Sequence, residues 1–344
     1  MMKALCVCDF AIDRQVMSQL ETLKKHGVEI EYIVDERMLS PKTITQFVLR
    51  AEQEGVDACE PWGDLLEKVR AAEILVTHVS PITSQVIEAG KKLKYVCVLR
   101  SSHTNVSVEA CRSRGITVVE APGRNADAVA DCTVGLMLAE VRNIARGHRA
   151  LMDGQWKKQF ANVMYTRDLR RCTVGIIGVG VIGRKVIQRV QAFGSRIVVY
   201  DPYVPQEVLA EQGLEAVSLE ELLDISDIVS IHLRLSERTK HFLGEREFAR
   251  MKKTAYFINT ARAGLVDEPA LIRALQEKQI GGAALDVFET EPLEADSPYL
   301  SLDNVTITPH VAGTSIDSFA NSVEIMGEEL EALLEGRQVP GLVH

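Results

Sequence analysis

The sequence predicts an α/β protein with two domains, each built on a doubly wound parallel sheet. Its 344 residues are too many for one ordinary domain and suit two. Short apolar runs alternate with stretches of helical periodicity over residues 4–119, and the alternation starts again at residue 173. Because parallel strands need crossover connections, this alternation favours two parallel sheets.

The first series of elements ends at residues 121–123, where Ala-Pro-Gly breaks the pattern. Residues 35–62 are polar, and we expect an insertion of helix and loop there. A long helix is expected over residues 125–146, followed by an irregular segment over 147–171. The other elements expected in this half are a helix at 13–25 and strands at 4–8, 28–34, 74–77, 95–99 and 118–119.

The second series begins with a strand and a glycine-rich turn, which a helix at 181–193 follows. A last helix at 315–334 is expected to return to the first domain. We therefore assign residues 1–120 and 311–344 to one domain and residues 121–310 to the other. The strands expected in this series are 173–177, 196–200, 228–232, 255–258, 283–287 and 305–308.

Composition excludes several classes of protein. The net charge is −9 and no run is rich in Lys or Arg, which disfavours nucleic acid and anionic membranes as partners but not a small anionic substrate. There is no apolar stretch of about 18 residues that would span a membrane, and no secretory signal pattern. Seven cysteines without a C-x-x-C spacing indicate neither disulfides nor a metal site and favour the reducing cytoplasm. Cys6 and Cys8 alternate in the first strand, and we interpret them as buried apolar side chains.

A G-x-G-x-x-G pattern, G-V-G-V-I-G, lies between an apolar strand and a helix. Gly178 permits a tight turn, Gly180 lets the backbone approach a pyrophosphate, and Gly183 lets the helix pack closely on the strand. The first N–H groups of the helix, near Val181 and Ile182, are then offered to the phosphates. The setting predicts a Rossmann dinucleotide-binding domain, and the alternative is an ordinary glycine turn before a core helix.

An acidic residue, Asp201, ends the next strand and is followed by Pro202. Its carboxylate can accept hydrogen bonds from the adenosine ribose hydroxyls and would repel a 2′-phosphate. We therefore favour NAD over NADP as the cofactor. A P-loop is excluded because Arg184 and Lys185 follow the last glycine, where that motif requires Lys and then Ser or Thr.

Reactive side chains follow three of the later strands, within residues 259–264, 286–292 and 308–310. The carboxyl ends of parallel strands are where α/β folds place their chemistry. These runs, together with the glycine turn, residues 125–130 and residues 264–268, resemble the D-isomer-specific 2-hydroxyacid dehydrogenases, a family that includes phosphoglycerate, glycerate and D-lactate dehydrogenases. The resemblance extends from about residue 74 to the C-terminus.

The resemblance implies a Rossmann NAD-binding domain inserted into a flavodoxin-like substrate domain. It also implies an active site between the domains and a catalytic set of Arg262, Glu291 and His310. The chemistry of 2-keto acid reduction requires the same types of residue, because it needs a clamp for the carboxylate, a proton donor and a group that orients the donor. Taken singly, each of these residues could be a surface charge or a structural side chain. The cofactor contacts that motif and resemblance imply together are Gly178, Gly180, Val181, Ile182, Gly183, Asp201, Pro202, His232, Thr260, Ala261 and Asp286.

The expected substrate loop departs from the family pattern. The family usually has Arg, alternating glycines and an Asp-Asn pair, whereas residues 100–106 read Arg-Ser-Ser-His-Thr-Asn-Val. A sugar acid or another polar hydroxy acid would suit this loop better than lactate. The residues expected to contact the substrate are Arg100, Ser101, Ser102, His103 and Asn125.

Three other functions share this fold. Formate dehydrogenases have Gln where Glu291 stands, so that residue argues against them. Corepressors of the C-terminal-binding-protein type keep the catalytic residues but act as NAD(H)-sensing scaffolds, and a protein that binds NAD only for structure is the third. The resemblance also implies a homodimer joined through the NAD-binding domain, with the helix from residue 125 and the segment 156–165 as candidate contacts, although their apolar residues could equally belong to the core.

Overall fold

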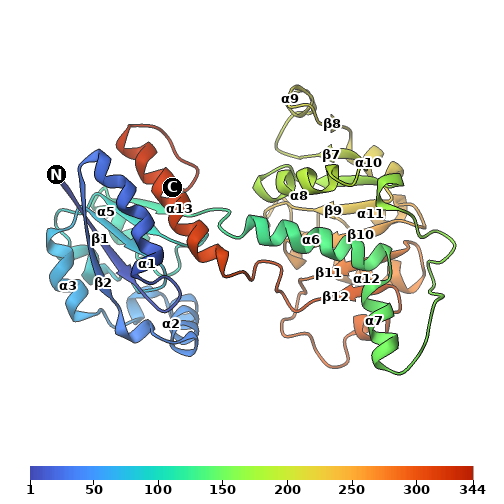
Figure 1. The fold of residues 1–344 in the computed structure, drawn as a ribbon, viewed down its shortest axis with the longest axis horizontal. Coiled ribbons are helices and arrows are strands. Elements are labelled where there is room, and N and C mark those ends of the chain that lie inside the picture. The colour runs from blue at the N-terminus through green and yellow to red at the C-terminus, as the bar shows by residue number, and fades with distance from the viewer. Residues whose placement is uncertain (344) are drawn as a thin grey trace. The chain divides into compact units, whose positions relative to one another are not determined.

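Two parallel sheets organise the chain in the computed structural model, which describes residues 1–343 (Figure 1). The chain divides into two compact units. Unit 1 comprises Met1–Asn125 and the chain from Ser315 onward, and unit 2 comprises Ala126–Thr314. The boundaries expected from the sequence, after residues 120 and 310, fall a few residues before these breaks. The predicted fold class, two doubly wound parallel sheets, is confirmed.

The sheet of unit 1 has five parallel strands in the order β2-β1-β3-β4-β5, which is the flavodoxin-like order. Its strands are β1 (Met2–Cys8), β2 (Val28–Val34), β3 (Ile74–Thr77), β4 (Tyr95–Val98) and β5 (Thr117–Glu120). Its helices are α1 (Arg14–Met17), which continues as the 3₁₀ helix η1 (Ser18–His26), α2 (Pro41–Glu54), α3 (Gly63–Lys68), α4 (Ser84–Ala89), α5 (Val108–Ser113) and α13 (Asp317–Leu334).

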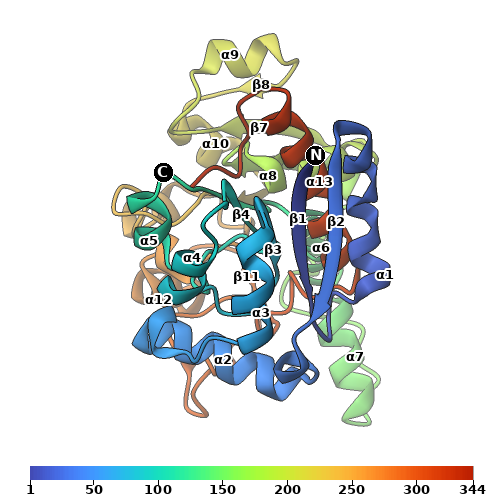
Figure 2. The ribbon, with the colours of Figure 1, turned by 90° about the vertical axis from the view of Figure 1, so that its left-hand side faces the viewer.

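Both faces of this sheet are covered, so alternate residues of β1 enter two different cores. Cys6 and Cys8 pack toward η1 and α13, as expected for buried apolar side chains, whereas Leu5 packs toward α3, α4 and α5 (Figure 2). Helix α13 presents Val323 and Met326 to that first core because residues three apart share one helix face. The last helix of the chain therefore packs on the N-terminal elements α1 and η1.

The sheet of unit 2 has seven parallel strands in the order β12-β11-β10-β9-β6-β7-β8. Its strands are β6 (Thr173–Ile177), β7 (Arg196–Tyr200), β8 (Glu215–Ala216), β9 (Ile228–Ile231), β10 (Tyr256–Asn259), β11 (Gly282–Leu285) and β12 (Val305–Ile307). Its helices are α6 (Ala126–Val141), α7 (Ile144–Met152), α8 (Val181–Gln191), α9 (Gln206–Glu211), α10 (Leu219–Ile225), α11 (Glu245–Arg250) and α12 (Glu268–Gln276). The chain order reverses between β6 and β9, as in dinucleotide-binding sheets.

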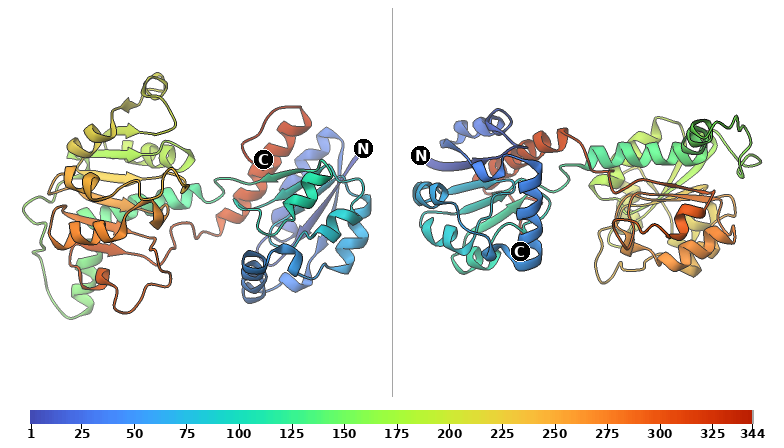
Figure 3. Two further views of the ribbon diagram at one scale, coloured as in Figure 1. Left: turned by 180° about the vertical axis from the view of Figure 1, so that it is seen from behind. Right: turned by 90° about the horizontal axis from the view of Figure 1, so that it is seen from below.

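Helices also cover both faces of this sheet. Helices α6, α8 and α9 pack on one face, and α10, α11 and α12 pack on the other (Figure 3). Neighbouring residues of β10 alternate accordingly, since Ile258 enters the first core and Phe257 the second. The carboxyl ends of β10, β11 and β12 carry the segments with reactive side chains, and the glycine turn follows β6 at the same edge.

Two expectations about local structure were wrong. The helix expected over 125–146 stops at Val141, because Asn143 adopts a left-handed conformation with φ of 56° and a new helix, α7, begins after it. Part of the segment expected to be irregular is therefore helical. The helical stretch expected over 13–25 is confirmed, as a single α turn followed by η1, whereas the short edge strand β8 was not anticipated.

All seven cysteines are free. No helix within residues 1–343 combines the length and the apolar character needed to cross a membrane.

Candidate active site

The glycine turn after β6 requires glycine at two positions for steric reasons. Gly178 has φ of +95°, and a Cβ there would lie 2.9 Å from the carbonyl carbon of His232. A Cβ on Gly183 would lie only 2.0 Å from the carbonyl oxygen of Gly178. Gly180 is different, because nothing lies within 4 Å of the position of its Cβ. The first and last glycines thus shape the turn, and the middle one leaves room above it.

The N-terminus of α8 fits a phosphate group. Its N-cap is Gly180, no side chain caps the helix, and its first turn contains no acidic residue. Gly180 and Val181 are exposed, so the first N–H groups are accessible. Free N–H groups and the helix dipole favour an anion at this end. The turn therefore has the open backbone surface that the pyrophosphate of NAD requires.

Asp201, just after β7, is tied to the same turn. Its Oδ2 accepts a hydrogen bond of 2.8 Å from the N–H of Val179, and its Oδ1 accepts one of 2.8 Å from the N–H of Tyr203. Each oxygen can accept a further hydrogen bond. Pro202 is exposed beside it. The arrangement places a fixed carboxylate next to the glycine turn, where it can receive ribose hydroxyls.

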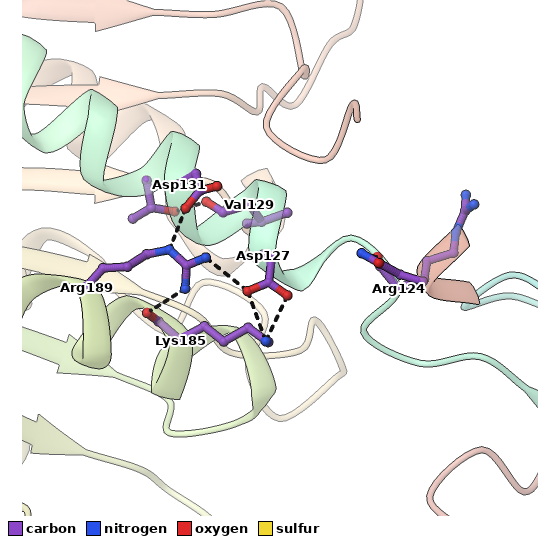
Figure 4. Close-up of polar contacts among 8 residues, drawn as sticks. Arg124, Asp127, Val129, Asp131, Lys185 and Arg189 are labelled. Carbon is purple, nitrogen blue, oxygen red and sulfur yellow. Dashed lines mark hydrogen bonds and ion pairs between the residues drawn. The ribbon is translucent and has the colours of Figure 1, made fainter. Parts of the chain in front are cut away.

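Charged side chains fasten α6 to α8 behind this turn (Figure 4). Asp127 of α6 accepts hydrogen bonds from Lys185 at 2.8 Å and from Arg189 at 2.9 Å, and Asp131 accepts one from Arg189 at 2.5 Å. The bonds from Lys185 and Arg189 lower the pKa of Asp127. Exposed ion pairs contribute little individually, so we attribute to this network the orientation of the helices rather than stability.

His232 lies directly behind the glycine turn. Its Nε2 is 2.9 Å from Oγ of Ser230. Its Nδ1 is buried and has no hydrogen-bond partner within residues 1–343. Burial lowers the pKa of His232 to about 4, so the ring is neutral at physiological pH. The expected contact of His232 with the cofactor stays a prediction, while its position behind Gly178 follows from the structure.

The expected catalytic residues meet around one open hollow of about 580 Å³. They come from three loops, after β10, β11 and β12, which share the carboxyl edge of the sheet. The hollow is lined by Leu235, Arg262, Ala263, Gly264, Val287, Phe288, Glu289, Glu291 and His310.

Glu291 and His310 form a hydrogen-bonded pair. Nδ1 of His310 lies 2.7 Å from Oε2 of Glu291, and Oε1 of Glu291 accepts a bond of 3.0 Å from the N–H of Phe288. Desolvation alone would raise the pKa of Glu291, but the hydrogen bonds from His310 and Phe288 and the charges of His310 and Arg262 outweigh it and lower the pKa. Glu291 is therefore an anion that fixes the imidazole ring. His310 itself has φ of 54°, a strained value that a non-glycine residue adopts mainly where its position matters.

Asp286, after β11, holds the segment that carries His310. Its side chain is fully buried, and Oδ1 accepts hydrogen bonds from Oγ1 of Thr308 at 2.5 Å and from the N–H of Val311 at 2.9 Å. Oδ2 accepts a bond of 2.8 Å from the N–H of Ala312. These bonds bracket His310 on both sides. The expected contact of Asp286 with the nicotinamide carboxamide stays a prediction, while its role in supporting the loop follows from these bonds.

Arg262 is exposed at the rim of the hollow, and its Nη1 donates to the carbonyl oxygen of Ala261 at 2.7 Å. Asn259, which the sequence analysis did not assign, shapes this loop. Its Nδ2 donates to the carbonyl oxygen of Arg262 at 3.1 Å, and its Oδ1 accepts from the N–H of Ala261 at 3.0 Å. The preference of Asn for such local turns is the signal that could have identified it. Thr260 is buried, and its hydroxyl lies 2.7 Å from that of Thr133 in α6.

The expected substrate residues all belong to unit 1. Oγ of Ser101 donates to the carbonyl oxygen of Ala121 at 3.2 Å, and Nδ1 of His103 lies 2.6 Å from Oε1 of Glu120. The loop after β4 is thus tied to the end of β5, its neighbour in the sheet. The remaining expected contacts, Arg100, Ser102 and Asn125, are half-buried at the same edge of this sheet.

Comparison with known proteins identifies the same residues as part of a known domain. Residues 134–312 match the model of the D-isomer specific 2-hydroxyacid dehydrogenase family, NAD binding domain. The chain is 40% identical over 284 residues to D-3-phosphoglycerate dehydrogenase of Methanocaldococcus jannaschii, a match that covers 82% of this chain and 53% of that protein. It is 38% identical over 282 residues to glyoxylate reductase of Korarchaeum cryptofilum, covering 81% and 85% of the two chains. The chain thus spans about half of the first relative and most of the second.

A solved structure shares the whole fold. The NAD complex of a D-isomer specific 2-hydroxyacid dehydrogenase from Lactobacillus delbrueckii ssp. bulgaricus aligns over 100% of both chains with a TM-score of 0.75 and 23% identity. At this identity the likeness establishes the architecture of the two sheets.

Proposed function

Because the chain belongs to the D-isomer specific 2-hydroxyacid dehydrogenase family of NAD-dependent oxidoreductases, we propose that it interconverts a D-2-hydroxy acid and its 2-keto acid by hydride transfer. The observation that carries the proposal is the hydrogen bond between His310 and Glu291 in a hollow that Arg262 also lines. Reduction of a keto acid requires a proton donor and a permanent cation close together, and His310 paired with Glu291 and the guanidinium of Arg262 are such groups.

In this proposal each side chain has one task. The guanidinium of Arg262 holds the substrate carboxylate and polarises the carbonyl. Glu291 occupies Nδ1 of His310, which leaves Nε2 to donate the proton to the developing alkoxide and to take it back in the oxidative direction. Bound NAD supplies or accepts the hydride. Asp286 and Asn259 keep the loops of His310 and Arg262 in place.

The residues present fit NAD. Gly178, Gly180 and Gly183 with the start of α8 would hold the pyrophosphate, and Asp201 would hold the adenosine ribose. The carboxylate of Asp201 would repel a 2′-phosphate, and this supports NAD over NADP.

We assign the substrate to the polar 2-hydroxy acids of the phosphoglycerate, glycerate or sugar-acid type. Residues 100–105 offer hydroxyl, imidazole and guanidinium groups, which suit a substrate with several polar groups better than lactate. The names of the relatives, D-3-phosphoglycerate dehydrogenase and glyoxylate reductase, agree with a small polar acid.

We further propose a homodimer joined through the NAD-binding domain, in the cytoplasm. Apolar side chains of α7 and the segment after it, among them Leu151, Met152, Trp156 and Met164, are largely exposed. A second copy of the chain would cover them. The seven free thiols agree with a reducing compartment.

Consumption of NADH, followed by absorbance, tests the activity. Purified protein is supplied with hydroxypyruvate, phosphohydroxypyruvate, glyoxylate or pyruvate, and compared with the variant His310→Asn. We expect turnover with a polar keto acid and a loss of about 10²- to 10⁴-fold in kcat for the variant. The matched control His26→Asn alters another His–Glu pair, with Glu331 in unit 1, and should leave kcat unchanged. Tight NADH binding without turnover of any acid would instead indicate an NAD(H)-sensing protein.

A further inference from the structure

Basic side chains gather at the carboxyl edge of the sheet in unit 1. β3, β4 and β5 are neighbours there, and His78, Arg100 and Arg124 follow them in turn. The strand order of this sheet reverses between β1 and β3, and open α/β sheets bind ligands outside the carboxyl ends of strands at such a reversal. The position is therefore suited to a ligand. Its basic side chains favour a ligand with negative charge.

Arg124 is held in place by an aromatic ring and a backbone hydrogen bond, with no ion-pair partner among the described residues. Its guanidinium carbon lies 5.8 Å from the ring centroid of Phe319, and its carbonyl oxygen accepts a hydrogen bond of 3.2 Å from Nδ2 of Asn321. Both partners come from α13, so the last helix of the chain fixes the turn that carries Arg124. Its Nη1 is buried and has no hydrogen-bond partner in the part of the chain that the structure describes. A buried guanidinium N–H without an acceptor is costly.

Arg100 is a second cation at this edge, and its charge adds to the cost of burying the guanidinium of Arg124. Arg100 and Arg124 follow neighbouring strands, β4 and β5, and burial together with the charge of Arg100 lowers the pKa of Arg124. Both arginines also act on His78. Burial lowers the pKa of His78, the hydrogen bond to Asp9 opposes that shift, and the two arginines add to it. Two cations side by side repel unless an anion comes between them.

The acids at this edge are engaged by other groups. Oδ2 of Asp9 lies 2.9 Å from Nδ1 of His78, and Oδ1 of Asp9 accepts two backbone N–H groups. Asp35 is bound to Arg37 and Ser80. Glu120 is bound to His103. Among the described residues, none of these carboxylates forms an ion pair with Arg124, so the positive charge is available to an external group.

We propose that Arg124, together with Arg100, forms an anion-binding subsite at the carboxyl edge of the sheet in unit 1, which takes a phosphate or carboxylate group of a small molecule. The guanidinium fork suits both groups. The anion has two possible sources, the second acidic group of a dianionic substrate or a separate inorganic anion. The first source rests on the proposed function, whereas the subsite itself does not.

Two measurements test the proposal on the full-length protein. In the kinetic arm, KM is measured for phosphohydroxypyruvate and for hydroxypyruvate with the wild type, Arg124→Gln and Arg124→Lys. Arg124→Gln removes a charged hydrogen-bond donor, so it should raise KM for phosphohydroxypyruvate about 10- to 100-fold more than KM for hydroxypyruvate. Arg124→Lys keeps the charge and should restore part of the lost affinity. The control Arg70→Gln removes an exposed arginine of the same unit and should change neither constant.

In the binding arm, titration calorimetry with inorganic phosphate is carried out on the same proteins. Phosphate binding that Arg124→Gln weakens, without a change in the ratio of KM values, would assign the subsite to a separate anion. If the wild type turns over no keto acid, the proposed function fails and calorimetry alone decides on the subsite. Equal phosphate affinity in the wild type and in Arg124→Gln, together with an unchanged ratio of KM values wherever turnover is seen, would overturn the proposal. Thermal unfolding of each variant verifies that it is folded.

Discussion

The carboxyl edges of the two sheets differ in how their charges are balanced. In unit 2, Glu291 is bonded to His310, and the buried Asp286 accepts hydrogen bonds from the hydroxyl of Thr308 and the N–H of Val311, on either side of that histidine. In unit 1, the carboxylates of the edge are engaged elsewhere, and Nη1 of Arg124 has no partner within residues 1–343. The same architecture thus carries a pair that can move a proton in one unit and, in the other, an arginine without an ion-pair partner among the described residues. Strand order provides the place for a site, and the pairing of side chains decides what the site can do.

The largest expected effect breaks the pair in unit 2. Glu291→Ala removes the acceptor at Nδ1 of His310, so the ring is no longer oriented or supplied with a counter-charge. We expect kcat to fall by about 10²- to 10⁴-fold with little change in the Kd of NADH, measured by absorbance and by fluorescence titration. Glu294→Ala, an exposed residue of the same loop, is the control. Retention of full kcat in Glu291→Ala would separate this glutamate from catalysis.

An intermediate effect on kcat is expected when the buried acid at the carboxyl edge of each sheet, Asp286 in unit 2 and Asp9 in unit 1, is replaced by Asn. In Asp286→Asn, the amide presents N–H groups to the backbone donors of Val311 or Ala312, which displaces the loop of His310. A displacement of about 1 Å can cost up to about 10²-fold in kcat. In Asp9→Asn, the lost partner is His78, so we expect a lower Tm and a smaller loss of kcat. Measuring Tm and kcat for both variants sharpens the contrast, and equal losses of kcat at equal Tm would contradict it.

The smallest expected effect is a pH dependence of stability that arises in unit 1. Glu329 is buried in α13, and both its oxygens accept the N–H of Gly341. Burial raises the pKa of Glu329 to about 7, which the hydrogen bond only partly offsets. The folded state therefore holds a proton that the unfolded state releases near its ordinary pKa, so stability falls as pH rises toward 7.

We expect Glu329→Gln to reduce the loss of Tm between pH 5 and pH 8, by about 2–8 °C. The matched control Glu328→Gln, an exposed neighbour on the same helix, should keep the dependence of the wild type. Differential scanning calorimetry at both pH values checks this. A pH profile in Glu329→Gln identical to that of the wild type would assign the dependence to other groups.

Local patterns accounted for most of the fold, and the resemblance to a known family identified the candidate catalytic residues among the side chains at the strand ends. Apolar runs predicted the long strands because burial on both faces leaves no polar alternation. Positions just after strands brought Arg262, Glu291 and His310 to one edge, since the carboxyl ends of parallel strands coincide. The glycine spacing predicted a turn whose steric limits the structure reproduces at Gly178 and Gly183.

What the sequence by itself determined is therefore the class of fold, the glycine turn and the set of side chains at the strand ends. Only the tertiary structure decided how polar groups far apart in the chain pair with one another. Asn143 ends α6 in a left-handed conformation, Asp286 turns toward Val311 and Ala312, and Arg124 packs on Phe319. The physical reason is the distance along the chain over which each kind of interaction acts. Periodicity and turn preference act within a few residues, whereas the partner of a buried charge depends on segments that meet only after the sheets have formed.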